Sequence, residues 1–248
     1  MSLPFNQAGW KTSLRALADL LMPRYCVVCD RELNLKEDYI CLCCEMDFPY
    51  THFWELPHNP MADEFNSRLQ TFDGVREPYC YASALFFYDD ASGYRRIPQK
   101  LKYSHLTAQG RVFSRRLGDV LAGADHLADV DAVVPVPLHW ARRFKRGYNQ
   151  AQIIAEEVAG AMGVPLLEGV LSKPRRKSSQ TKGGASARAQ NISGAFKAKA
   201  PDIPVRHILI VDDTFTTGYT LAACHAALRR VLPAEVRISV ASLAFVQK

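Results

Sequence analysis

Two adjacent carboxylates, Asp212 and Asp213, directly follow a short apolar run at residues 208–211. An apolar, mostly β-branched run that is bounded by a turn is typical of a strand buried on both faces. Apolar residues at helical spacing then predict a helix from about Tyr219. Hydroxyl groups and one glycine lie between the acids and the first turn of that helix, at Thr214, Thr216, Thr217, Gly218 and Thr220.

This order of strand, acids, loop and helix suits a phosphorylated sugar. A helix N-terminus offers free backbone N–H groups to a phosphate, and a glycine lets the phosphate come close. The carboxylates suit sugar hydroxyls, which donate hydrogen bonds to them, or a divalent cation. An ordinary strand-turn-helix with solvated acids is the alternative. The Gly-Lys-Ser/Thr ending of a P-loop is missing, so nucleoside triphosphate hydrolysis by that route is not expected.

The stretch resembles the signature of the type I phosphoribosyltransferases, in which an apolar strand ends in two acids and runs into Thr-Thr-Gly-x-Thr. The resemblance implies that Asp212 and Asp213 bind the ribose hydroxyls of phosphoribosyl pyrophosphate (PRPP), together with Mg²⁺. It implies a catalytic set of these two acids and Thr216. Purine-salvage members often carry an acid where this chain has Thr216. The implied PRPP contacts also include Thr214, Thr217, Gly218, Tyr219 and Thr220.

A second block narrows the resemblance to the ComF/GntX branch, phosphoribosyltransferase-like proteins tied to competence and DNA use. Val-Pro-Val-Pro-Leu at residues 134–138 is followed by Arg-x-x-x-Arg-Gly-Tyr-Asn-Gln-Ala at residues 142–151. The resemblance places Pro137 and Leu138 on the pyrophosphate side of PRPP. It assigns DNA or pyrophosphate contacts to polar residues of the branch: Lys102, Arg142, Arg146, Asn149, Gln150, Gln180, Arg188 and Asn191.

Paired cysteines near the N-terminus predict a structural zinc site. Cys26 and Cys29 form one Cys-x-x-Cys pair, and Cys41 and Cys44 form another. Four thiolates from two such pairs close a tetrahedral Zn²⁺ site with no open position. Cys43 could replace a member of the second pair. Buried cysteines without metal are the alternative.

Composition places the chain among globular proteins that work inside the cell. Of its 248 residues, 48% are apolar and 23% are charged, which is typical of a packed domain. No apolar run is long enough for a transmembrane helix, and the N-terminus does not resemble a secretory signal. Seven cysteines without export favour reduced thiols, so we expect a cytoplasmic protein.

The predicted organisation is an α/β fold with a parallel sheet flanked by helices and a small N-terminal zinc-binding module. Its segments are an amphipathic helix within residues 1–24 that packs on the body, the zinc module at 25–60, a linker with short elements at 61–80, and the phosphoribosyltransferase-like domain at 81–248. The strands expected in that domain are 81–88, 131–138, 208–211 and 236–244, and the helices are 110–121 and 151–162. Residues 172–195 are basic and glycine-rich, so they predict a lid or a disordered linker. Cys80, Cys224, His207 and His225 are expected to be structural, and His52 and His58 to lie on the surface.

Two functions fit this organisation. One is an enzyme that transfers a phosphoribosyl group from PRPP and releases pyrophosphate. The other is a binding module that senses PRPP and holds single-stranded DNA, because basic and aromatic residues alternate in one stretch: Tyr94, Arg95, Arg96, Lys100, Lys102, Tyr103, Arg111, Arg115 and Arg116. A scaffold that docks a helicase-type DNA translocase through the zinc module is a weaker hypothesis.

Overall fold

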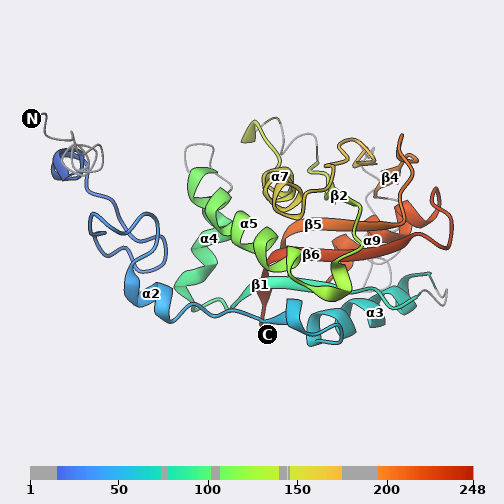
Figure 1. Ribbon diagram of the computed structural model, residues 1–248, viewed down its shortest axis with the longest axis horizontal. Coiled ribbons are helices and arrows are strands. Elements are labelled where there is room, and N and C mark those ends of the chain that lie inside the picture. Colours follow the sequence, from blue (N-terminus) through green and yellow to red (C-terminus); the bar gives the residue numbers. More distant parts are fainter. Residues whose placement is uncertain are drawn as a thin grey trace, which may run out of the picture.

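A central parallel sheet organises the computed structural model, which describes residues 16–73, 78–101, 107–139, 144, 146–174 and 195–247. Helices cover both faces of the sheet (Figure 1). Within the described residues the elements are, in order, α2 (Leu42–Met46), η1 (Phe53–Glu55), α3 (Pro60–Asp73), β1 (Ala82–Tyr88), η2 (Gly93–Arg95), α4 (Arg96–Lys100), α5 (Thr107–Ala122), η4 (Asp125–Leu127), β2 (Ala132–Pro135), α7 (Gln150–Met162), β3 (Leu171–Ser172), β4 (Lys197–Ala198), β5 (His207–Phe215), α9 (Tyr219–Arg229) and β6 (Arg237–Val246).

The sheet has the strand order β1-β6-β5-β2, and each neighbouring pair is parallel. Strand β5 is central, and its alternate side chains enter two separate cores. Leu209 and Val211 pack in the core that includes residues of α5 and α7. Ile208 and Ile210 pack in the core that includes residues of α3 and α9. Burial on both faces explains why the strand is continuously apolar, and the predicted α/β fold class is confirmed.

Strand β5 is longer than the sequence indicated. The predicted strand stopped before the two acids, whereas β5 continues through them to Phe215. The reason is the neighbouring strand β6, which pairs Asp212 with Ser242 and Phe215 with Phe245. The backbone that carries the acids is therefore part of the sheet, although their side chains are only half-buried.

The stretch expected to be a linker with short elements forms a 14-residue helix, α3, and that expectation was wrong. The side chain of Asn59 accepts a hydrogen bond from the backbone N–H of Ala62 at 3.0 Å, which starts the helix. Met61, Phe65 and Leu69 recur on one face and are buried in the same core as α9. The aromatic residue of this face therefore fills the core and is not free to stack on nucleotide bases.

The N-terminal amphipathic helix is described only from residue 16 to residue 21, and the start of the predicted helix lies outside the described residues. Leu17, Leu20 and Leu21 were expected to pack on the body of the protein. Their exposed fractions are 59%, 79% and 78%, so this expectation is corrected for the described part. The segment is attached through Arg24, which donates to Asp19 at 2.7 Å and to the carbonyl oxygen of Asn34 at 3.1 Å.

The residues expected to be structural are buried. Cys80 and Cys224 lie in the core, and the Sγ atom of Cys80 is 3.5 Å from Nε2 of His225. Burial lowers the pKa of His225 to about 3, so this histidine is neutral at physiological pH. His207 lies between Asp129 and Ser239, at 2.8 Å from each. His52 and His58 are exposed, as predicted. Among the described residues, no helix combines the length and the apolar character that crossing a bilayer requires.

Candidate functional site

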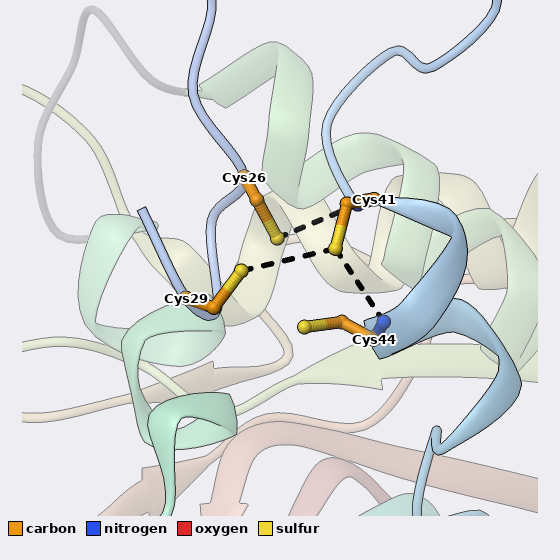
Figure 2. Close-up of side chains that lie close together, drawn as sticks. All are labelled: Cys26, Cys29, Cys41 and Cys44. Carbon is orange, nitrogen blue, oxygen red and sulfur yellow. Dashed lines mark hydrogen bonds between the residues drawn. The ribbon is translucent and has the colours of Figure 1, made fainter. Parts of the chain in front are cut away.

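Four cysteine side chains from two turns converge at one point of the N-terminal module (Figure 2). The sulfur atoms of Cys26, Cys29, Cys41 and Cys44 all lie within 4.8 Å of one another. Those of Cys29 and Cys41 are 3.8 Å apart, close to the separation of roughly 3.8 Å that follows from tetrahedral coordination at ~2.3 Å per Zn–S bond. Cys43 is exposed and lies outside this cluster, with its sulfur 3.5 Å from Arg31. The four thiols could therefore hold a metal ion in a closed set of ligands.

The environment of the cluster favours deprotonated sulfur at one position. Burial raises the pKa of Cys26, but hydrogen bonds from backbone N–H groups, with those of Cys29 and Cys41 foremost, lower it to about 7.

The N-terminal module is fixed to the body of the protein by side-chain contacts. Glu45 accepts from the guanidinium of Arg116 at 2.7 Å and 3.0 Å, and the hydroxyl of Tyr94 donates to the carbonyl oxygen of Cys44 at 2.8 Å.

The two acids line a second site, at the carboxyl end of β5. Asp212, Asp213 and Thr214 border a cavity of about 360 Å³. The loop that follows encloses a smaller cavity of about 20 Å³. This cavity is lined by Asp212 and by residues 214–221. Gly218 has a φ of +69°, and a Cβ atom there would lie 2.9 Å from the ring of Phe215. Only glycine fits without strain at this turn, which opens α9.

Another part of the lining of the larger cavity is made by the segment after β2 and by the start of α7. It contains Val136, Pro137, Leu138, His139, Arg146, Asn149 and Gln150. The side-chain amide of Asn149 donates to the carbonyl oxygen of Val136 at 2.9 Å, which ties this segment to the start of the helix. Gln150 is 2% exposed, and its Nε2 atom has no hydrogen-bond partner among the described residues. Gln150, which lines the cavity, therefore carries a buried donor without a partner among the described residues.

Two helix N-termini border the acid pair. Helix α7 begins after Asn149, whose side chain does not cap the helix, and helix α9 begins after Gly218, which has no side chain to do so. The first backbone N–H groups of each helix therefore remain available to a ligand, and the helix dipole favours negative charge at both ends. One cavity is thus bordered by two helix N-termini that favour anions and by the two carboxylates.

Residues from distant parts of the chain complete the cavity, and sequence reasoning missed them. Tyr88 enters from the end of β1, while Lys173 and Phe196 enter from beside β3 and β4. The hydroxyl of Tyr88 and the side chain of Thr214 share a hydrogen bond, and burial raises the pKa of this tyrosine. The ammonium of Lys173 lies 4.7 Å from the centre of the Phe196 ring. The one sequence signal for a role in this cavity was the position of Tyr88 at the end of the strand predicted at residues 81–88.

Five residues that the family resemblance implied lie outside the described residues: Lys102, Arg142, Gln180, Arg188 and Asn191. The same holds for most of the segment expected to form a lid.

The basic stretch that suggested nucleic-acid binding is largely engaged in ion pairs. Arg111 donates to Glu157 at 2.7 Å and to Glu156 at 2.8 Å, which joins α5 to α7. Other partners are carboxylates as well, namely Asp30 for Arg96, Asp119 for Arg115 and Glu45 for Arg116. These arginines are therefore not the unpaired positive surface that the sequence suggested.

Comparison with known proteins agrees with the geometry. Residues 145–243 match the family described as phosphoribosyl transferase domain. The chain is similar to competence protein F of Haemophilus influenzae, with 31% identity over 44% of this chain and 48% of that protein. It is also similar to the DNA utilization protein YhgH of Escherichia coli strain K12, with 25% identity over 86% of this chain and 87% of that protein. The aligned region spans about half the length of the Haemophilus protein. The resemblance inferred from the motifs is confirmed.

Proposed function

From the phosphoribosyl transferase domain that this chain carries, we propose that the cavity at the end of β5 binds PRPP with Mg²⁺. The loop before α9 takes the 5′-phosphate, Asp212 and Asp213 accept hydrogen bonds from the ribose hydroxyls, and the start of α7 faces the pyrophosphate. The observation that carries this proposal is that the starts of two helices without side-chain caps border the same cavity as the acids. PRPP likewise combines two anionic groups with the hydroxyls of a ribose.

The residues around the pyrophosphate end suit a leaving group that gains negative charge. Arg146, just before the start of α7, lines this part of the cavity, and a cation placed where charge develops stabilises a transition state. In the transfer, the acceptor forms a bond to the anomeric carbon as the bond to pyrophosphate breaks, and pyrophosphate leaves with the electron pair. Mg²⁺ would be held mostly by ligand oxygens and would neutralise part of the phosphate charge. Thr216 is not an acid, so a carboxylate does not assist the acceptor from that position.

Whether the site transfers the group or only senses PRPP is decided by turnover. We expect pyrophosphate release when PRPP is supplied with the correct acceptor, tested over a panel of bases, other amines and DNA. Binding of PRPP without release across the panel would favour the sensing function. Binding that is absent altogether would contradict both.

Gly218→Val should abolish PRPP binding by a route that does not involve the carboxylates. Valine is strained at a φ of +69°, and its Cβ atom would lie 2.9 Å from the Phe215 ring, so the loop must shift away from the phosphate position. Gly163→Val is a matched control, because Gly163 also has a positive φ of +69° but has open space around its Cβ position. Isothermal titration calorimetry should show lost affinity for Gly218→Val and wild-type affinity for a folded Gly163→Val. Equal affinities would contradict the proposed phosphate position.

For the cysteine cluster we propose a structural Zn²⁺ ion held by Cys26, Cys29, Cys41 and Cys44. Two observations support this. The four sulfurs lie at mutual distances that suit tetrahedral coordination, and four protein ligands leave no position for substrate. Free thiols at this density agree with a reducing compartment, so we also propose that the protein works in the cytoplasm.

We further propose that the protein acts in the uptake or use of DNA, supported by the names of the two relatives. Direct contact with single-stranded DNA would be made by the arginines and lysines of residues 142–146 and 175–177, and by Arg95 and Lys100, because Arg96 is paired with Asp30. Affinity should then fall steeply as salt rises, because bound phosphates release counterions. Fluorescence anisotropy with labelled oligonucleotides tests this at several salt concentrations. No binding at low salt, or binding that salt does not weaken, would contradict direct contact. Docking of a DNA translocase stays a prediction.

A further inference from the structure

Arg68 of helix α3 contacts the loop that precedes α9 and the first residue of that helix. Nε of Arg68 donates to the carbonyl oxygen of Thr217 at 3.2 Å, and Nη1 donates to the hydroxyl of Tyr219 at 3.0 Å. The guanidinium also lies over the Tyr219 ring, 4.2 Å from its centre. One side chain thus makes three contacts with residues on both sides of Gly218.

The position of this arginine is fixed by the packing of its helix. Phe65 and Leu69 bury one face of α3 in the core shared with α9. The rings of Phe65 and His225 are arranged edge to face, with their centres 6.2 Å apart. The amide of Asn66 donates to the carbonyl oxygen of Cys80 at 2.8 Å, and its Oδ1 atom accepts from the N–H of Cys80 at 3.0 Å. The Arg68 side chain is 24% exposed, with Glu64 at 3.8 Å.

The contact with Thr217 matters because of the peptide bond that it restrains. Gly218 has a φ of +69°, and glycine passes easily between backbone conformations, so the peptide between residues 217 and 218 is free to rotate unless something holds it. In a planar trans peptide the carbonyl and the N–H point in opposite directions. Because Arg68 holds the carbonyl oxygen of Thr217, the N–H of Gly218 points the other way, away from Arg68 and from α3.

We propose that Arg68 is a positioning residue that sets the orientation of the 217–218 peptide and of Tyr219, so that the phosphate loop is organised before a ligand arrives. This inference rests on the proposed function, since it assigns the loop to the 5′-phosphate. Arg68 acts through the backbone and through Tyr219, and it does not contact the phosphosugar. Organising the loop in advance lowers the entropy that binding must otherwise supply.

The test compares Arg68→Gln with wild type in two measurements. In ligand-free protein, hydrogen–deuterium exchange of the amides of residues 217–221 should be faster in the variant, while exchange in β6 is unchanged. In calorimetry, Arg68→Gln should bind ribose 5-phosphate and PRPP about tenfold more weakly, the effect of losing roughly one hydrogen bond to a charged donor. Pyrophosphate alone should bind as in wild type, because its site is at α7. Arg115→Gln is the matched control, since among the described residues Arg115 pairs only with Asp119 on its own helix.

Unchanged exchange and unchanged affinity in Arg68→Gln would overturn the inference. Equal weakening of ribose 5-phosphate and pyrophosphate would also overturn it, because that pattern means general damage to the domain. If wild-type protein binds no phosphosugar, the proposed function fails, but the exchange measurement still decides whether Arg68 orders the loop.

Discussion

Replacing Asp212 and Asp213 together with alanine should weaken PRPP binding at least about a hundredfold and leave the protein folded. A hydrogen bond that involves a charged group contributes roughly 1.5–3 kcal/mol, and every 1.4 kcal/mol changes the affinity about tenfold. Losing two such hydrogen bonds to the ribose therefore weakens PRPP binding by at least about a hundredfold. The fold should survive because both side chains are only half-buried, and the backbone at Asp212 stays paired with Ser242 of β6.

A matched control exists at the same edge of the sheet. Asp89 and Asp90 directly follow β1, so Asp89→Ala with Asp90→Ala removes the same charge from the end of a strand that is separated from β5 by β6. This control should bind PRPP much as wild type does. Equal loss in both double variants would mean that the net charge at this edge, and not contact with the ribose, controls binding.

Cys26→Ser should release the bound zinc and loosen the N-terminal module. Cys26 is 0% exposed, and structural Zn²⁺ contributes roughly 10–16 kcal/mol of apparent binding free energy in small zinc-dependent folds. The module would lose its main source of order, because residues 25–48 contain only one short helix, α2. The sheet should persist, since one of its two cores contains no residue from 25–48. Elemental analysis and hydrogen exchange measure the two effects.

Cys43→Ser provides the control for the zinc site, because Cys43 lies outside the cluster and is exposed. It should keep one zinc per chain and the exchange pattern of wild type. Wild-type protein without zinc would contradict the site. Zinc loss in Cys43→Ser and not in Cys44→Ser would show that Cys43 is a ligand.

The central motif was predictable because its signals are local. An apolar strand, two acids, a glycine and a helical repeat follow one another within about twenty residues, so sequence order also gives order in space. The paired cysteines are local in the same sense. Each Cys-x-x-Cys pair is a single turn, and only the meeting of the two turns depends on the fold.

Other features depend on contacts between distant residues, and sequence reasoning did not reach them. Arg68 precedes Thr217 by 149 residues, and nothing near it in the sequence indicates a partner. Helix α3 was hidden by the prolines and aromatic residues around it. The ion pairs of the basic stretch were hidden for a similar reason, since the carboxylates that pair with Arg111 and Arg116 lie in α7 and α2.

The most direct test of the central claim is calorimetric titration of wild-type protein with PRPP in the presence of Mg²⁺, repeated with Asp212→Ala/Asp213→Ala and with Asp89→Ala/Asp90→Ala. The proposed site predicts one PRPP bound per chain by wild type and by the Asp89/Asp90 variant, and binding at least about a hundredfold weaker by the Asp212/Asp213 variant. Unchanged affinity in the Asp212/Asp213 variant, with the protein folded, would contradict it and would place any PRPP site elsewhere.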